Sequence, residues 1–174
     1  MKNSTLNLLA AGIVSAGITL LSPSYAACSC AKASVACTCA APCACAPCNC
    51  AKAAAACTRL GGHLAIINDE EEFNEVTRLA DEQGLIYVWI GAHRVGGVEK
   101  WEDGRDLTDG FVRWARGEPT YIDRNDQVAE DYIMLWKNNG TWVFNDNRDD
   151  PYADYPDMFE GIIGYVCEFN DSAA

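Results

Sequence analysis

The apolar positions near the middle of the chain repeat at helical spacing. Phe73, Val76 and Leu79-Ala80 recur at intervals of three or four residues, and Gly84 follows them as a stop signal. Such spacing places the apolar side chains on one face of a helix. The pattern therefore predicts an amphipathic helix that packs this face against a core and ends near Gly84.

Polar residues ahead of this helix provide a start signal. Asn68 and Glu71 have the spacing of a capping box, in which each side chain accepts a hydrogen bond from the other residue's backbone N–H. The acidic run 69–72 also suits the positive end of the helix dipole. We interpret this run as the solvated first turn of the helix and not as a metal site.

A different pattern, the unbroken apolar run, predicts a buried strand at 85–90. Gly91-Ala92 follows this run and would let another backbone approach closely. Shorter apolar or alternating runs predict the remaining strands, and an alanine-rich stretch predicts a helix ahead of Gly61-Gly62. This helix is expected at 52–60, and the strands are expected at 63–67, 133–136, 141–144 and 164–169, with a turn at 138–140.

The first segment has the features of a secretory signal peptide. Residues 6–21 form an apolar run without charges that is short for a transmembrane helix. Ser24-Tyr25-Ala26 places small residues at the cleavage spacing, so we expect a signal peptide at 1–26. An uncleaved membrane anchor and lipidation of Cys28 are the alternatives. The expected location is secreted, cell-surface or periplasmic.

The segment at 27–51 consists almost entirely of alanine and cysteine. Alanine methyl groups bury little area, so this segment is not expected to form a packed core. Its repeated Cys-x-Cys pairs, from Cys28 to Cys50, suit either a soft-metal thiolate site or an oxidised tether. Export favours the tether, which would allow a disulfide-linked oligomer, although the spacing does not set the connectivity.

Charge and composition exclude two classes of function. The formal net charge is −12, which repels phosphate backbones and excludes nucleic acid as a partner. The chain has only two histidines, and no serine or cysteine is placed beside one as a nucleophile, so we do not expect an enzyme. His63 lies in an apolar run beside a turn and is interpreted as a structural, hydrogen-bonded histidine.

Seven short motifs follow one another along most of the chain. They are Gly61-Gly62-His63-Leu64-Ala65, Trp89-Ile90-Gly91-Ala92, Trp101-Glu102-Asp103-Gly104, Trp114 with Gly117-Glu118-Pro119, Glu130-Asp131-Tyr132, Asn145-Asp146 and Tyr165-Val166-Cys167-Glu168. In this order they resemble the C-type lectin-like domain family. The resemblance implies an α+β fold in which two helices flank small antiparallel sheets and a long loop binds the ligand. We place this domain at 52–170, with a tail at 171–174.

The resemblance also implies a calcium site. In calcium-dependent members, a Glu-Pro-Asn or Gln-Pro-Asp triplet around a cis-proline, a later Glu and an Asn-Asp pair hold one ion. That ion chelates two vicinal hydroxyls of a sugar, so the implied partner is a glycan or glycoconjugate. Carboxylate and carboxamide oxygens are the hard donors that calcium takes. The implied metal ligands are Glu118, Glu130, Asn145 and Asp146, and the implied sugar contacts are these four with Thr120.

Several residues depart from the family pattern or add to it. Thr120 stands where the family has Asn or Asp, and its hydroxyl is a weaker donor on a shorter side chain. The insert 121–127 contributes Asp123 and Asp126, which could supply a substitute ligand or bind a second ion, or could belong to a polar loop without metal. Asp131 falls where some members bind an auxiliary calcium.

The cysteine pattern also differs from that of many members. Tyr132 stands where many have a cysteine, and the matching cysteine after Asp146 is missing, so both halves of an inner disulfide are absent. The resemblance then leaves Cys57 with Cys167 as the predicted disulfide of the domain. The cysteine-alanine segment has no aromatic strand where the family usually has its first strand.

Two functions follow from the resemblance. The first is a secreted module that binds carbohydrate through calcium held in the long loop. The second is a calcium-independent module of the same fold that binds a protein surface or has a structural role, and Thr120 keeps this alternative open. Aromatic rings in the polar loop at 147–159 suit either a sugar face or a protein partner.

Overall fold

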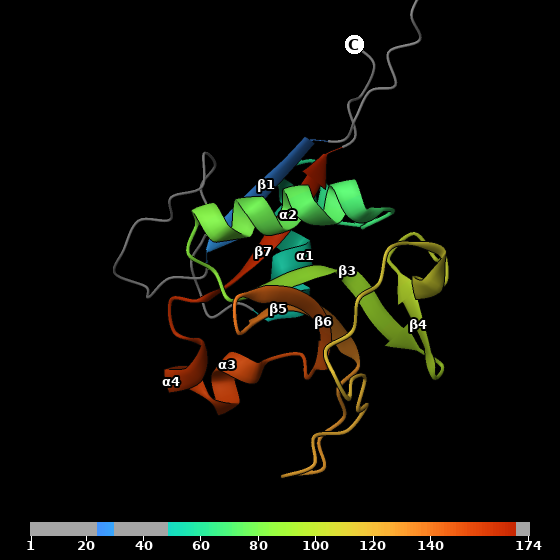
Figure 1. Cartoon of the computed structure of the whole chain (residues 1–174), viewed down its shortest axis with the longest axis vertical. Helices are drawn as coiled ribbons and strands as arrows, with labels where there is room; N and C mark the ends of the chain where they lie inside the picture. The colour runs from blue at the N-terminus through green and yellow to red at the C-terminus, as the bar shows by residue number, and fades with distance from the viewer. Residues whose placement is uncertain (1–23, 30–48, 170–174) are drawn as a thin grey trace, which may run out of the picture.

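The computed structural model describes residues 24–29 and 49–169 (Figure 1). Most of the predicted signal peptide, most of the cysteine-alanine segment and the tail lie outside these residues. The described elements form one mixed sheet of seven strands with helices packed around it, which confirms the predicted α+β class. None of the helices among the described residues combines the length and the hydrophobicity of a membrane-spanning segment.

The sheet has a single continuous network of strand pairs. Its order is β1-β7-β3-β5-β6, with β2 also paired to β7 and β4 paired to β3. The β3–β7 pair is parallel, so the small antiparallel sheets expected from the sequence are joined into one mixed sheet. The strands are β1 (Ser24–Ser29), β2 (His63–Leu64), β3 (Tyr87–Val95), β4 (Val98–Trp101), β5 (Tyr132–Asn138), β6 (Thr141–Asn147) and β7 (Ile163–Phe169).

The apolar run that predicted a buried strand forms the middle of the sheet. In β3, Val88, Trp89 and Ile90 are fully buried. A side chain at Gly91 would place its Cβ 2.7 Å from the carbonyl oxygen of Leu64, so glycine is needed for this close approach. The core also takes in Trp101 and Phe144, whose rings meet edge to face.

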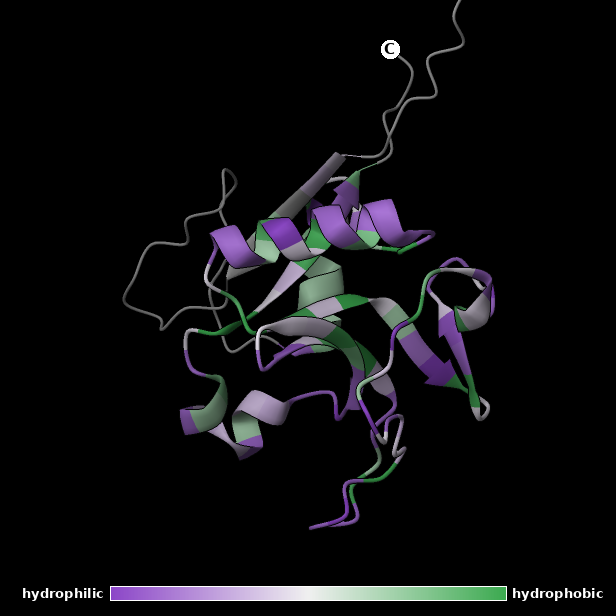
Figure 2. Ribbon diagram, in the orientation of Figure 1, coloured by the Kyte–Doolittle hydropathy of each residue, from purple (hydrophilic) through white to green (hydrophobic). Residues whose placement is uncertain are grey.

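Helix α2 (Glu70–Glu82) is amphipathic as predicted, and Figure 2 shows hydrophilic and hydrophobic residues alternating around it. Its cap lies one residue later than the predicted Asn68. The Asp69 side chain accepts a hydrogen bond from the Glu72 N–H at 3.0 Å, and Glu72 accepts one from the Asn68 N–H at 2.8 Å. The predicted box of Asn68 and Glu71 is therefore not formed: Asp69, which has the extended backbone of a cap, caps the helix, and Glu72 binds the N–H of the residue before the cap.

Helix α1 (Cys50–Arg59) begins at Asn49, whose side chain accepts a hydrogen bond from the Lys52 N–H at 2.8 Å. The helix thus begins inside the segment assigned to low complexity. Its buried Cys57 forms the predicted disulfide with Cys167 of β7, with an S–S distance of 1.99 Å. The bridge fixes the first helix of the domain to the closing strand.

Strand β1 is the main departure from the sequence prediction. It pairs antiparallel with β7, with Tyr25 opposite Glu168 and Ala26 opposite Cys167. The first strand that the sequence did not show is therefore supplied by residues 24–29, which span the end of the predicted signal peptide and the start of the cysteine-alanine segment. The expected cleavage after Ala26 falls inside β1, and cleavage there would remove the half-buried Tyr25 that packs against the core. The boundary of the signal peptide stays a prediction.

The remaining segments are connections around the sheet. The 3-10 helix η1 (Leu107–Asp109) precedes a long loop at 111–131, which extends beyond the β5–β6 part of the sheet on the side opposite α2 (Figure 1). The segment predicted as a polar loop at 147–159 contains two short helices, α3 (Pro151–Asp154) and α4 (Pro156–Phe159). Each has proline in its first turn, where the missing N–H costs no helical hydrogen bond.

Candidate functional site

The long loop is attached to β6 immediately before the two predicted ligands of that strand. The Ala115 N–H donates to the Phe144 carbonyl at 2.8 Å, and the Phe144 N–H donates to the Arg113 carbonyl at 2.7 Å. This short parallel pairing places the turn at Gly117-Glu118 beside Asn145-Asp146. The backbone thereby joins ligand candidates that are far apart in the sequence. The Glu118–Pro119 peptide bond is cis, as the resemblance implied.

Asp146 is the anchor of the loop. Its side chain is buried, with 3% of the residue exposed, and its two oxygens accept hydrogen bonds from the backbone N–H groups of Thr120 and Tyr121 at 3.2 and 2.6 Å. A buried carboxylate needs such partners. Each oxygen keeps a lone pair for a further ligand, so these contacts do not exclude a metal.

Thr120 and Glu130 meet from opposite sides of the loop. The Thr120 hydroxyl donates to Glu130 Oε2 at 2.9 Å, and the Glu130 N–H donates to the Tyr121 carbonyl at 2.9 Å. Thr120 therefore holds a predicted ligand in place through its hydroxyl. The threonine that departs from the family pattern has a defined contact inside the candidate site.

The carboxylates of the site repel one another. The pKa of Glu130 is raised to about 7, mainly by burial; the Thr120 hydroxyl opposes this rise, and the nearby charges of Asp146, Asp123 and Glu118 add to it. Burial also raises the pKa of Glu118, with the adjacent Asp146 carboxylate as the next cause. The pKa of a carboxyl group rises in this way where negative charges converge without a cation.

One carboxylate oxygen in this group has no hydrogen-bond partner. The Oε2 atom of Glu118 is buried and has no hydrogen bond, which is uncommon for a carboxylate oxygen. An unpartnered oxygen beside carboxylates with raised pKa values fits a hard cation such as calcium. The Asn145 amide nitrogen donates to the Asp146 carbonyl, which leaves the side-chain oxygen of Asn145 without a use in this contact.

The predicted calcium ligands do not form a complete coordination shell in this structure. Among residues 24–29 and 49–169, no three His, Cys, Asp or Glu side chains are arranged so that they could hold a metal ion. The site thus has the donor chemistry of a calcium site, and part of its donor capacity is used in hydrogen bonds within the loop. Coordination by Glu118, Glu130, Asn145 and Asp146 stays a prediction.

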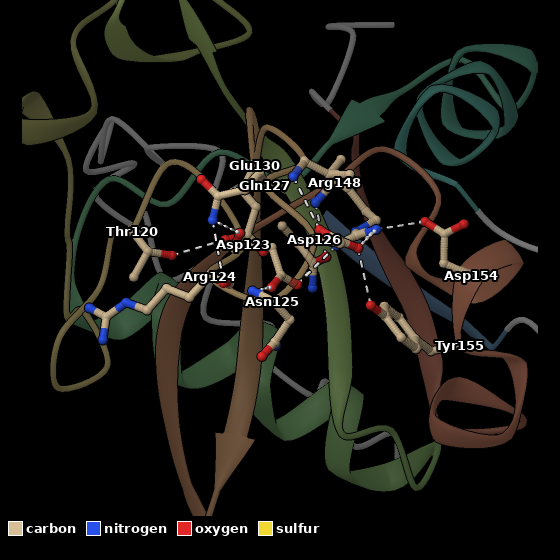
Figure 3. Close-up of polar contacts among 12 residues, drawn as sticks. Thr120, Asp123, Arg124, Asn125, Asp126, Gln127, Glu130, Arg148, Asp154 and Tyr155 are labelled. Atoms are coloured by element: carbon tan, nitrogen blue, oxygen red, sulfur yellow. Dashed lines mark hydrogen bonds and ion pairs between the residues drawn. The ribbon is translucent and has the colours of Figure 1, made fainter.

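The candidates for a second ion lie against arginines. Arg148 is 6% exposed, and its guanidinium contacts Asp123 at 2.9 Å and Asp126 at 2.8 Å (Figure 3). It also contacts Asp154 of α3 at 2.8 Å, and it lies over the Tyr155 ring at 5.3 Å. We call Arg148 with these four partners the Arg148 cluster. The Arg148 guanidinium therefore pairs with the aspartates that the sequence suggested as ligands of a second metal ion.

Asp131 has a similar partner on the other side of the loop. Its carboxylate accepts a hydrogen bond from Arg94 Nε at 2.8 Å, and its carbonyl accepts one from the Arg94 N–H at 2.6 Å. The same guanidinium lies 4.6 Å from the centre of the Tyr121 ring. The predicted auxiliary ligands Asp123, Asp126 and Asp131 are thus shared between two arginines, and a metal role for them stays a prediction.

The sequence interpretation missed both arginines. Arg148 follows Asn145-Asp146 by only two residues, and the insert at 121–127 carries two aspartates, so a cation directly after the predicted ligand pair was the available signal. The pairing itself spans 22 or more residues along the chain, which spacing alone does not reveal. His63 was interpreted as structural, and its Nδ1 lies 2.9 Å from the Leu64 carbonyl oxygen.

A hollow of about 300 Å³ opens beside these carboxylates. Glu118, Thr120 and Glu130 line it on one side. Arg116, Arg124 and Asn125 are also in its wall. The hollow is shallow and polar, which suits a hydrophilic ligand better than an apolar one.

Comparison with known proteins places the chain in one family. The model of the lectin C-type domain matches residues 46–149. E-selectin of rabbit is 36% identical over 87 residues, which is 49% of this chain and 15% of that protein. The chain therefore corresponds to a small part of this curated relative.

Solved structures share the fold at lower identity. The C-type carbohydrate-recognition domain of cow CD23, solved in the presence of a GlcNAc2Man3 oligosaccharide, has a TM-score of 0.53 and 23% identity, and the match covers 72% of this chain and 82% of that one. Herring type II antifreeze protein has a TM-score of 0.52 and 22% identity, with 71% and 84% covered. These likenesses show the fold alone, because proteins with different roles share it.

Proposed function

Because this chain belongs to the C-type lectin domain family, we propose that it is a calcium-dependent carbohydrate-binding module. The proposed calcium ligands are Glu118, Glu130, Asn145 and Asp146. A sugar would bind at the same place through two neighbouring hydroxyl groups. The proposal covers this domain and does not extend to the other activities of longer relatives.

The observation that supports it most directly is the unpartnered Glu118 Oε2. It belongs to a group of three acidic side chains, in which burial and mutual repulsion raise the pKa of Glu118 and of Glu130. A divalent cation would remove both penalties, because it would give the free oxygen a ligand and would neutralise the repulsion. When bound, calcium supplies open coordination positions for sugar hydroxyls.

The residues of this chain would orient the sugar around that ion. Carboxylate oxygens of Glu118 and Glu130 accept hydrogen bonds from sugar hydroxyls, and the Asn145 amide can donate one. Thr120 takes the place of an acid or amide, and its hydroxyl is directed to Glu130. The proposed site therefore has one sugar-facing donor fewer than the family pattern, and we expect weak binding at a single site.

Weak binding at a single site would make multivalency useful. We propose that the protein acts outside the cell, where the cysteines of the segment at 27–51 could cross-link chains. Non-reducing gels of the secreted protein test this, since a ladder of oligomers that collapses on reduction is expected. Material that runs only as a monomer would contradict it.

The alternative function is a calcium-independent protein-binding module. The specific observation in its favour is that hydrogen bonds from the backbone of Thr120 and Tyr121 already satisfy Asp146 without metal. A loop held in this way can present a fixed surface to a protein. Figure 3 shows the polar contacts that hold the neighbouring part of the loop.

Calorimetric titration of calcium into the folded protein separates the two functions. We expect binding in the micromolar to millimolar range, lost in Glu118→Gln. The matched control is Glu71→Gln, which changes an exposed glutamate on α2 and should leave binding intact. A glycan array with and without a chelator then follows. Absence of calcium binding in the wild-type protein would reject the proposal and favour the alternative.

A further inference from the structure

Two arginines at the edge of the proposed sugar site have no salt bridge with the described residues. Five of the eight arginines between residues 49 and 169 form salt bridges with carboxylates: Arg78, Arg94, Arg105, Arg113 and Arg148. Within this described part of the chain, Arg59, Arg116 and Arg124 form none. Two of these three, Arg116 and Arg124, line the hollow beside Glu118 and Glu130.

An unpaired arginine is unexpected in a protein with a formal net charge of −12. Carboxylates are abundant on this surface, and two of them, Glu118 and Glu130, line the same hollow as these arginines. Both guanidinium groups nevertheless have no salt-bridge partner among the described residues, and both residues are exposed. Five N–H donors on each guanidinium are therefore available to a ligand in the hollow.

The position of Arg124 is visible in the close-up of the loop. Its side chain extends away from the Arg148 cluster and lies on the side of the view where Thr120 is found (Figure 3). Asp123, the neighbouring acid, is held by Arg148 at 2.9 Å and is not engaged with Arg124. The Arg148 cluster thus uses the nearby carboxylate, and Arg124 stays in the wall of the hollow without a salt bridge to Asp123.

We propose that Arg116 and Arg124 form an anion subsite and that the preferred ligand is a sugar bearing a carboxylate or a sulfate. This inference rests on the proposed function, because the sugar hydroxyls would bind at the calcium ligands next to it. Arginine is suited to the task, since its planar fork binds carboxylate and sulfate oxygens in pairs.

The local charge supports an anionic ligand. Glu118, Glu130 and Asp146 together with one calcium ion leave a single negative charge, which alone would repel an acidic sugar. Asp123 also lines the hollow, but its carboxylate is paired with Arg148. The guanidinium groups of Arg116 and Arg124 are therefore the positive charges in the hollow that no carboxylate of the described residues pairs with, and direct contact with them would attract an acidic sugar.

Matched sugars test the proposal directly. Methyl glucuronide and methyl glucoside differ only in a carboxylate at the sixth carbon, and methyl galacturonide and methyl galactoside form a second pair. Titrations at low salt should show the acid binding about tenfold more tightly than its neutral partner, since each exposed ion pair contributes about two- to fivefold. This advantage should shrink at high salt. Glucose 6-sulfate distinguishes a sulfate preference from a carboxylate preference.

Variants assign the preference to the two arginines. Arg116→Gln/Arg124→Gln should abolish the difference between acidic and neutral sugars without weakening the binding of calcium or of neutral sugars, because neither arginine is a proposed calcium ligand. The control is Arg59→Gln, which removes the third arginine without a salt bridge, on α1 and away from the hollow. It should leave the difference intact.

The possible failures are distinct. Equal affinity for acid and neutral partner in the wild-type protein, or a preference that survives the double substitution, overturns the anion subsite and leaves the proposed function standing. If acidic sugars bind through the two arginines but a chelator has no effect on that binding, the anion subsite is supported and the calcium mechanism is rejected. No binding of any of these sugars rejects both.

Discussion

The guanidinium of Arg148 donates a hydrogen bond to Asp123 Oδ2 across 2.9 Å and joins the end of β6 to the tip of the long loop. Through the same group, the loop is also joined to α3 at Asp154. The loop that carries Glu118 and Glu130 is therefore held by a permanent cation. Contacts within the chain thus hold this part of the loop in place.

Replacing this cation should loosen the loop. In Arg148→Met, we expect the free energy of unfolding to fall by about 2 kcal/mol, because hydrogen bonds between charged groups are lost while most packing volume is kept. We also expect weaker calcium binding. Urea unfolding and calcium titration measure the two effects. Arg78→Met is the control, since Arg78 forms exposed ion pairs on α2 and should change neither quantity. Similar losses in both variants would argue against a special role for Arg148.

Acidification should release calcium. Because burial raises the pKa of Glu130 to about 7, this ligand takes up a proton in mildly acidic solution and no longer coordinates a cation. Affinity should fall by up to about tenfold per pH unit below that value. Calcium titrations between about pH 8 and pH 5.5 measure it. Constant affinity over that range would show that Glu130 is not a ligand.

The calcium-free protein should respond to pH in the opposite direction. A carboxyl group whose pKa is higher in the folded state than in the unfolded state binds its proton more tightly when folded. Stability is therefore gained as pH falls through about 7, and it is lost again as pH rises. Melting temperatures in the presence of a chelator should increase from pH 8 to pH 6. This slope should flatten in Glu130→Gln, and an unchanged slope in that variant would assign the effect to another group.

The disulfide between Cys57 and Cys167 should be the strongest single stabiliser of the domain. It joins residues 110 apart, so opening it should cost about 5 kcal/mol in the chain-entropy description. Chemical denaturation of Cys57→Ala/Cys167→Ala against the wild-type protein measures this loss. Cys50→Ala removes a buried cysteine without a disulfide partner and should cost much less. Equal losses would show that packing, and not the cross-link, is responsible.

The first strand should make the stability depend on where the mature chain begins. A protein starting at Ser24 keeps Tyr25 against the core, whereas one starting at Ala27 loses it and half of β1. We expect the longer form to be more stable by about 1–2 kcal/mol from apolar burial. Thermal melts of both forms, with Tyr25→Ser in the longer form as the control, measure this. Identical melting temperatures would show that β1 contributes little. Mass spectrometry of the secreted protein would locate the actual cleavage.

Much of the candidate site could be predicted because its parts are local. Glu118-Pro119 and Asn145-Asp146 are short motifs whose order along the chain indicated the family, and the structure joins them through the backbone pairing of Ala115 with Phe144. The amphipathic spacing of Phe73, Val76 and Ala80 determined α2 for the same reason, since periodicity is a property of neighbouring residues. The resemblance also supplied the pairing of Cys57 with Cys167.

Other features were decided only by the tertiary structure, because they depend on residues that meet from distant parts of the chain. Nothing near Arg148 in the sequence specifies that it contacts Asp123 and Asp126, and nothing near Tyr25 specifies that its strand pairs with β7. Sequence alone likewise does not show that Arg116 and Arg124 line one hollow and have no salt bridge with any residue at 24–29 or 49–169. The sequence determined the family and the donors of the site, and folding determined which charges remain free to meet a ligand.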